Sequence, residues 1–446
     1  MHWYHAPLVG PMGSREGKTL KSQKSFAKAT LVAFACFFLA PLCARLLAAR
    51  PQQIKKVPVL TVGIKVRQEK VRIGSTKGLR VFDGHSGRKL FSKLKPKPML
   101  LRVDPKGFLI EGYGVRSKIR VEPLKGSLLS VDGHRYRGNF VVEEDRFGKI
   151  TVINVIDVEE YLYGVIKSEM LISSPMEALK AQAVIARTFA IKHKERYTKI
   201  RGYGLSADTS SQVYTGVRGE DPRGNRAVDA TRGRVLTFKG NLIDSYYHSA
   251  CGGWTLNNED AWGGSPQAYL RSRRCGYCAD SAGFSWKISL TYDHILEKLL
   301  EEGHKLTSIR TIRTINDPKS GNRVLVLVIE NGKGQKRMLG NMFRLAMGAN
   351  VIRSAFFHMD ESHKKSPGPM AKASDTSAAE MKMRELIGDY LQEVSAPREL
   401  VLDGCGSGHG VGLCQSGARG LAELGASFSE ILSFYYKNTA LSVFYK

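Results

Sequence analysis

Motifs that identify several common enzyme classes are missing from this sequence. The glycine-rich segment GCGSGHGVGLCQSGARG lacks the Lys-Ser/Thr ending of a phosphate-binding loop. A serine hydrolase elbow is absent, and none of the usual nucleic-acid-binding motifs occurs. The sequence therefore excludes a P-loop nucleotide-binding protein and an elbow-type serine hydrolase.

Acidic residues are scarce in the N-terminal quarter. Residues 1–110 hold 22 Lys or Arg against 4 Asp or Glu, which gives +18 of the net charge of +27. These basic residues are spread through strand-like segments, so an anionic envelope surface or wall polymer suits them better than nucleic acid. We expect no nucleic-acid partner.

The N-terminal apolar run is short for a membrane span, unless the LLAA that follows Arg45 is counted with it. It covers residues 29–44, follows five basic residues and precedes Arg45. This layout is typical of a signal peptide. We expect residues 1–50 to be a signal peptide, or an anchor in the inner membrane if uncleaved, and the protein to be exported to the periplasm or cell envelope.

The rest of the chain divides by its pattern of apolar residues. Residues 57–156 form short strand-like runs separated by turn signals such as Asp83-Gly84. Helices and short strands follow, with hairpins expected across Lys239-Gly240 and Asn331-Gly332. We predict a mixed α+β fold. Its parts are a basic β-rich module at 57–135, a main domain at 136–446 and a polar insertion near 360–398.

A carboxylate ends the first strongly helical segment. Asp157 and Glu160 have the spacing of a capping box, so a helix is expected just after Asp157. Glu169 then falls on the helix face that carries the apolar residues. We expect Glu169 to point toward the core.

A second helix is expected with Ser174 as its cap and Pro175 in its first position, running to about Tyr197. It is apolar on most sides, so Arg187 within it needs an anionic partner. Two interpretations stay open. Glu169 and Arg187 form a structural ion pair, or Glu169 is an acid in a cleft, with its pKa raised by desolvation.

Seven segments in register carry a resemblance to a known family. They are EEYLYGVIKSEM, EALKAQAVIARTFA, LSADTSSQVY, YYHSACGGWT, AWGG, IRSAFF and GHGVGLCQSGA. From about Tyr136 to the C-terminus, the chain resembles the stage II sporulation protein D family, also called SpoIID/LytB. The resemblance implies a SpoIID-type mixed helix/strand catalytic core.

The same resemblance implies a function. It points to a peptidoglycan lytic transglycosylase, which cleaves between N-acetylmuramic acid and N-acetylglucosamine in peptide-stripped glycan strands and leaves 1,6-anhydro ends. The alternative is a non-catalytic glycan-binding protein that modifies the activity of a cell-wall amidase, as some relatives are described. The expected partners are glycan strands and, in the alternative, the amidase.

Individual roles also follow from the resemblance. The family's catalytic glutamate matches Glu169, which would act first as acid and then as base, so that one carboxylate suffices. The residues expected to bind substrate are Arg187, Asp208, Ser210, Gln212, Tyr214, His248, Ser249, His409 and Gln415.

Four cysteines raise the question of a metal. Cys275-x2-Cys278 has the spacing of a zinc site, as does the pair His248 and Cys251, and Cys414 lies in a motif expected at the same cleft. We expect a structural zinc bound by Cys251, Cys275 and Cys278, with Cys414 or His248 as the fourth ligand. The alternative in an exported protein is one or two disulfides.

Overall fold

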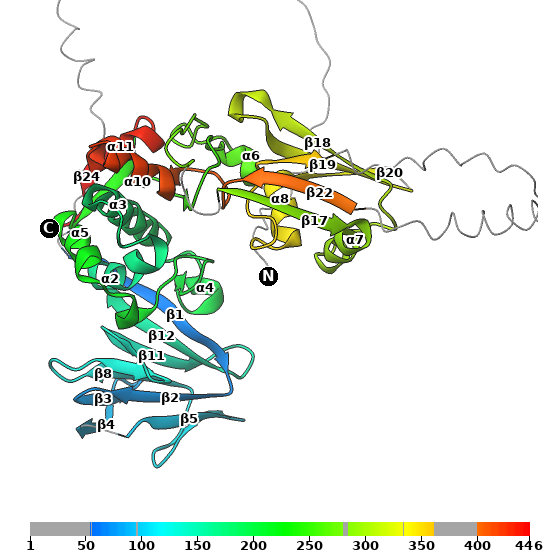
Figure 1. Ribbon diagram of the computed structural model, residues 1–446. Helices are drawn as coiled ribbons and strands as arrows, with labels where there is room; N and C mark the ends of the chain where they lie inside the picture. Colours follow the sequence, from blue (N-terminus) through cyan, green and yellow to red (C-terminus); the bar gives the residue numbers. More distant parts are fainter. Residues whose placement is uncertain (1–53, 55, 95–96, 280–283, 333, 361–398) are drawn as a thin grey trace, which may run out of the picture.

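The computed structural model describes residues 54, 56–94, 97–279, 284–332, 334–360 and 399–446, and it has a mixed α+β fold (Figure 1). The expected signal segment at 1–50 and nearly all of the expected insertion at 360–398 lie outside these residues. Within the described part, no helix is long and apolar enough to cross a membrane.

Two β-sheets form the N-terminal region, at the lower left of Figure 1. The seven-stranded sheet has the order β13 (Leu205–Ser206), β1 (Val59–Gln68), β12 (Ile150–Asp157), β11 (Asn139–Glu144), β8 (Lys118–Pro123), β3 (Gly78–Asp83) and β4 (Lys89–Leu94). The six-stranded sheet has the order β10 (His134–Tyr136), β9 (Leu129–Val131), β2 (Lys70–Ser75), β5 (Met99–Asp104), β6 (Gly107–Ile110) and β7 (Gly114–Arg116). Alternate residues of these strands, such as Leu60 and Val62, are fully buried, so the prediction of a β-rich N-terminal region is confirmed.

The seven-stranded sheet continues past the predicted module boundary at 135/136. β12 pairs antiparallel with β1, placing Asp157 opposite Val59, and β11 pairs with β8. The boundary therefore falls within one sheet, because the strands just before the first helix complete the sheet that β1 begins.

Helices follow this sheet along the chain, the first of them packing against its strands β1 and β12, and two smaller sheets complete this part of the fold. The helices are α2 (Val158–Glu169), α3 (Met176–His193), α4 (Thr198–Arg201), α5 (Pro222–Ala230), α6 (Asn258–Trp262), α10 (Gln415–Glu423) and α11 (Phe428–Tyr435). The strands are β14 (Arg234–Phe238) with β15 (Asn241–Leu242) and β24 (Ala440–Val443), and β16 (Tyr247–His248) with β23 (Leu413–Cys414). β14 and β15 form the hairpin predicted across Lys239-Gly240.

The two first helices follow the sequence signals to different degrees. Asp157 caps α2 as predicted, accepting from the backbone N–H groups of Glu159 and Glu160 at 2.9 Å. The predicted bounds of α3 are wrong: its N-cap is Pro175, with no side-chain cap, and it ends at His193. It ends early because the chain folds back there, and a side-chain carbon on Gly204 would lie 1.6 Å from the Lys194 carbonyl oxygen.

A second unit with its own core forms from residues 285–332, 334–360 and 399–405. Its elements are β17 (Ser285–Thr291), α7 (Tyr292–Glu301), β18 (Thr311–Asp317), β19 (Arg323–Asn331), β20 (Gly334–Leu339), α8 (Gly340–Met347), β21 (Phe357–Asp360) and β22 (Glu399–Cys405). Leu327, Phe343 and Leu402 are fully buried in this core. β19 and β20 form the predicted hairpin across Asn331-Gly332. The unit lies at the right of Figure 1, and the chain leaves it through β22 to reach β23 and α10.

Candidate active site and cysteine cluster

Glu169 is the last residue of α2, and its carboxyl is half-buried. One carboxyl oxygen, Oε1, accepts from the backbone N–H of Val213 at 2.6 Å, and the hydroxyl of Tyr247 also bonds to the carboxyl. Burial raises the pKa of Glu169 more than these two bonds lower it. No Lys or Arg among the described residues forms an ion pair with it, so the carboxyl is held in its protonated form to a higher pH than usual.

A buried amide fixes the direction of the Tyr247 hydroxyl. Gln212 is fully buried; its Nε2 donates to the Tyr247 oxygen at 3.1 Å, and its Oε1 accepts from the Tyr161 hydroxyl at 3.1 Å. Because the Tyr247 oxygen accepts from Gln212, its own proton is free to point at Glu169.

The loop that carries Gln212 and Val213 can pack closely against α2 because α2 has a glycine, Gly164, at the point where the two segments meet. The Tyr214 ring lies against Gly164, where a side-chain carbon would be 2.6 Å from it. Tyr214 is 3% exposed and donates to Asn154 Oδ1 at 2.8 Å. Assigning Gln212 and Tyr214 to substrate binding is therefore wrong for this structure, since both side chains are committed inside the protein.

Arg187 does not pair with Glu169, which corrects both roles predicted for it. Its side chain is fully buried, and its Nε and Nη2 bond to the two carboxylate oxygens of Glu159 at 3.1 and 2.8 Å. Glu159 also accepts from the Tyr445 hydroxyl and from the Gly233 N–H at 3.1 Å. Together with these bonds, the Arg187 charge lowers the pKa of Glu159 despite burial. Glu159 and Arg187 form the structural ion pair, and neither side chain can reach a substrate.

The two histidines expected at the site are neutral. His409 donates from Nε2 to the Tyr247 carbonyl at 3.0 Å and accepts at Nδ1 from the Val411 N–H at 3.1 Å; burial and the Arg344 charge lower its pKa to about 3. His248 is buried, and burial likewise lowers its pKa well below the ordinary value. His248 therefore cannot touch a substrate, and His409 positions the Tyr247 backbone.

The remaining predicted residues keep part of their surface. Gln415 Nε2 donates to the Glu169 carbonyl at 2.6 Å, which ties α10 to the end of α2. Asp208 is exposed and accepts from the Ser210 N–H at 2.8 Å, so these two residues form a turn. Ser249 is exposed two residues beyond Tyr247. Substrate binding by these residues stays a prediction.

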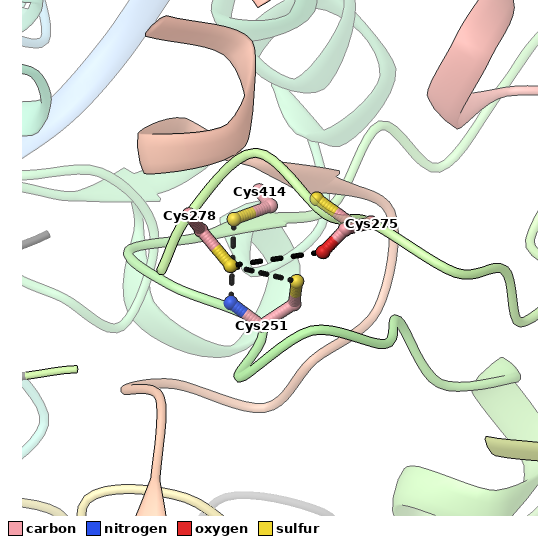
Figure 2. Close-up of side chains that lie close together, drawn as sticks. All are labelled: Cys251, Cys275, Cys278 and Cys414. Carbon is pink, nitrogen blue, oxygen red and sulfur yellow. Dashed lines mark hydrogen bonds between the residues drawn. The ribbon is translucent and has the colours of Figure 1, made fainter. Parts of the chain in front are cut away.

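The four predicted metal-ligating cysteines meet in one buried cluster, with their sulfur atoms within 4.8 Å of one another (Figure 2). They come from three segments: Cys251 after β16, Cys275 and Cys278 after α6, and Cys414 at the end of β23. All four are free thiols. Four converging sulfur atoms match the donor set of a closed, tetrahedral zinc site.

Groups around the cluster suit a negatively charged centre. The backbone N–H groups of Cys251 and Gly417 both donate to Cys414 Sγ at 3.2 Å, and the Tyr435 hydroxyl lies 3.2 Å from Cys275 Sγ. These polar hydrogens stabilise thiolates more than thiols.

Arg323, at the start of β19, lies beside the cluster and was not anticipated from the sequence. It is fully buried, and its Nη2 donates to the carbonyls of Cys251 and Trp254, while Nε and Nη1 have no hydrogen-bond partner. Among the described residues no carboxylate pairs with it. Burial lowers the pKa of Arg323, and the potential negative charges that oppose this shift are the thiols of Cys251, Cys405, Cys414 and Cys278.

Comparison with known proteins adds a family. Residues 146–238 match the family model SpoIID, described as a stage II sporulation protein. The chain contains a SpoIID domain. The matched segment runs from the turn between β11 and β12 to the end of β14 and includes Glu169, Glu159 and Gln212.

Several curated relatives extend the similarity beyond the SpoIID domain. An uncharacterized protein of Brachyspira hyodysenteriae is 29% identical over 309 residues, covering 69% of this chain and 72% of the relative. The Bacillus subtilis stage II sporulation protein D is 27% identical, covering 64% of this chain and 75% of that protein. The Bacillus subtilis amidase enhancer is 28% identical over 75% of this chain, but the match spans only 48% of the enhancer.

Proposed function

We propose that this protein is a peptidoglycan lytic transglycosylase in which Glu169 is the only acid and base. The observation that carries the proposal is the Glu169 carboxyl, with its raised pKa, its bond to Tyr247 and no cationic partner among the described residues. The similarity to stage II sporulation protein D supports a cell-wall substrate.

The proposed reaction requires one proton shuttle. Protonated Glu169 gives its proton to the glycosidic oxygen as the bond from that oxygen to the muramic acid C1 breaks. The 6-hydroxyl of the same muramic acid then bonds to C1 and returns its proton to the Glu169 carboxylate. Among the described residues, no other carboxylate contributes to the raised pKa of Glu169, which agrees with a site that uses one.

A second candidate function rests on the amidase enhancer match. In this alternative the SpoIID domain binds glycan without cutting it, and the protein modifies a cell-wall amidase. Export to the periplasm or envelope, through the N-terminal segment, belongs to both proposals.

We further propose that the cluster of Cys251, Cys275, Cys278 and Cys414 holds a structural zinc ion. Four cysteines would close its coordination shell and tie three chain segments together. A tetrathiolate zinc centre carries a net charge of −2 and would offset the unpaired charge of Arg323.

Product analysis tests the proposed activity. The exported protein is incubated with peptide-stripped and with intact glycan strands, and mass spectrometry identifies the new ends. Anhydro-ended fragments from the stripped strands are expected. Strand binding with no such product on either substrate would refute the transglycosylase and support the amidase modifier.

A further inference from the structure

A first arginine cluster lies at the turn between β11 and β12. The guanidinium carbons of Arg67 and Arg146 lie 4.1 and 4.8 Å from the centre of the Phe147 ring. Arg67 belongs to a β-bulge of β1, with a φ of 56° that residues other than glycine seldom adopt, and its N–H donates to Thr151 Oγ1 at 3.3 Å. The strained backbone thus directs an arginine onto an exposed aromatic ring.

A second cluster of the same kind lies at α4. The guanidinium carbons of Arg196 and Arg201 lie 5.2 and 4.3 Å from the centre of the Tyr197 ring. Lys199, between the two arginines in the chain, is exposed. A guanidinium stacked on an aromatic ring keeps N–H groups along its edge available for an oxyanion. Both clusters therefore present cations suited to an anionic partner.

The two clusters flank one strand pair on the same face of the seven-stranded sheet. Glu143 of β11 lies directly opposite Thr151 of β12, so their side chains share a face. Arg67 bonds to the Thr151 side chain. Gly202, the residue after α4, packs against Glu143 with no room for a side-chain carbon, and Figure 1 shows α4 beside β1 and β12. The two clusters together are called the arginine face below.

The arginine face keeps its positive charge. Its five cations form no ion pair with a carboxylate of the described residues; they are Arg67, Arg146, Arg196, Lys199 and Arg201. Segments 143–149 and 194–202 contain four carboxylates, of which Glu143 and Glu195 pair with lysines. Asp145 accepts from the Phe147 N–H at 2.9 Å, which leaves Glu144. The face therefore carries a net positive charge.

Apolar side chains are exposed among these cations. Phe147 is 51% exposed, Ile200 of α4 is 64% exposed, and Val66, next to Arg67, is 36% exposed. Sugar binding uses free ring faces, whereas guanidinium groups stack on the rings of Phe147 and Tyr197. Exposed apolar side chains bordered by arginine and lysine are instead typical of a surface that lies in the headgroup region of a membrane.

We propose that the arginine face binds the anionic phospholipid surface of a membrane. Phe147 and Ile200 lie in the headgroup region, and the stacked arginines bind lipid phosphates. This contact belongs to the folded domain and depends neither on the N-terminal segment nor on the proposed transglycosylase activity. Each arginine near an anionic bilayer should contribute roughly fivefold to the affinity.

Quenching of a tryptophan on the arginine face tests this partner. Phe147→Trp, in the full chain, places a fluorescent ring in the first cluster, and lipids with brominated acyl chains quench a ring that enters the bilayer. The vesicles contain brominated phosphatidylcholine alone or equal parts of brominated phosphatidylcholine and phosphatidylglycerol. The parent gives the background from its own four tryptophans. We expect the anionic vesicles to quench the added fluorescence and the neutral vesicles to leave most of it.

Charge variants of the same Phe147→Trp chain test the arginines. Arg67→Gln with Arg146→Gln should need roughly tenfold more anionic lipid for half of the quenching, and the two Arg→Lys changes should stay within about threefold. The matched control is Arg313→Gln with Arg337→Gln, which removes two exposed arginines of the second unit and should behave like the Phe147→Trp chain. The N-terminal segment is the same in all of these proteins.

Two results would overturn the proposal. One is a Phe147→Trp ring that anionic vesicles leave unquenched, and the other is an Arg67→Gln and Arg146→Gln protein that needs no more lipid than the matched control. If those arginine changes instead weakened sedimentation with insoluble peptidoglycan and left the quenching intact, the face would bind wall polymer and the lipid assignment would be wrong. Product formation enters none of these measurements, so a lack of anhydro products would count against the proposed activity alone.

Discussion

The two ends of α2 hold glutamates in opposite environments. Glu159, in the first turn, is neutralised by Arg187 and accepts two more hydrogen bonds, so its pKa is lowered. Glu169, at the last residue, has a hydroxyl and one backbone N–H as partners, and burial raises its pKa. Two carboxyl groups whose pKa values are shifted in opposite directions have different roles. The first stabilises the fold, and the second is equipped for proton transfer.

The largest stability effect is expected at the start of α2. Glu159→Gln leaves Arg187 buried without a negative partner, which should cost about 3–5 kcal/mol of unfolding free energy. Chemical denaturation measures it. Glu160→Gln is the neighbouring control: Glu160 is half-buried and pairs with Arg137 at 3.9 Å, so we expect a loss of about 1 kcal/mol or less. An equal loss of unfolding free energy in Glu159→Gln and Glu160→Gln would refute the structural role assigned to the Glu159–Arg187 pair.

Arg323 extends the comparison to a second buried guanidinium, which lacks a carboxylate partner in the described part of the molecule. If zinc thiolates supply its counter-charge, Arg323→Met should weaken zinc binding by roughly tenfold, while Arg337→Met should leave it unchanged. Competition with a chromophoric chelator measures zinc affinity, and elemental analysis measures zinc per chain. A parent protein without zinc, or an Arg323→Met protein with unchanged affinity, contradicts the proposed metal centre.

The two glutamates should also give opposite pH dependences of stability. The pKa of Glu159 is below its ordinary value of 4.5, so its contribution is present above about pH 4.5 and is lost as pH falls through the lowered pKa. The pKa of Glu169 is above 4.5, so its contribution is present below about pH 4.5 and is lost as pH rises through the raised pKa. Unfolding free energies of the parent and of each Glu→Gln variant, measured across pH, give the two curves by difference. If the contributions of Glu159 and Glu169 to the unfolding free energy changed with pH in the same direction, the opposite pKa shifts assigned to them would be wrong.

The smallest effect is expected from the partner of Glu169. The Tyr247 hydroxyl lowers the pKa of Glu169, so Tyr247→Phe should raise that pKa further. The alkaline limb of the pH–rate profile should move to higher pH, with a change in turnover of roughly tenfold or less. An alkaline limb at the same pH in Tyr247→Phe and in the parent would show that Tyr247 does not affect the pKa of Glu169.

Local signals in the sequence predicted much of the local structure. Asp157 caps α2, and two hairpins lie where their turn residues placed them. These features depend on residues close in the chain. The separate core of the second unit was missed, because its strands β17 and β22 pair across more than 100 residues.

The site was predicted less completely, for the same reason. The position of Glu169 on the apolar face of its helix correctly indicated that its side chain points into the protein. The cysteine spacing selected four residues whose sulfur atoms do meet. Arg187 was given the wrong carboxylate, since Glu159 and Glu169 both lie on α2 and spacing alone cannot choose between them. Arg323 begins an apolar strand and carries no signal for burial, which comes from packing against the cysteine segments.

Glu169→Gln tests the central claim most directly. The amide keeps the shape of the side chain but cannot transfer a proton, and the change leaves no cation of the described residues unpaired. Anhydro-ended products from peptide-stripped strands and thermal unfolding are measured on the same preparation, with the parent as reference. The account predicts a folded protein that still binds strands and whose turnover falls by at least roughly two orders of magnitude. A folded variant with the turnover of the parent would contradict it.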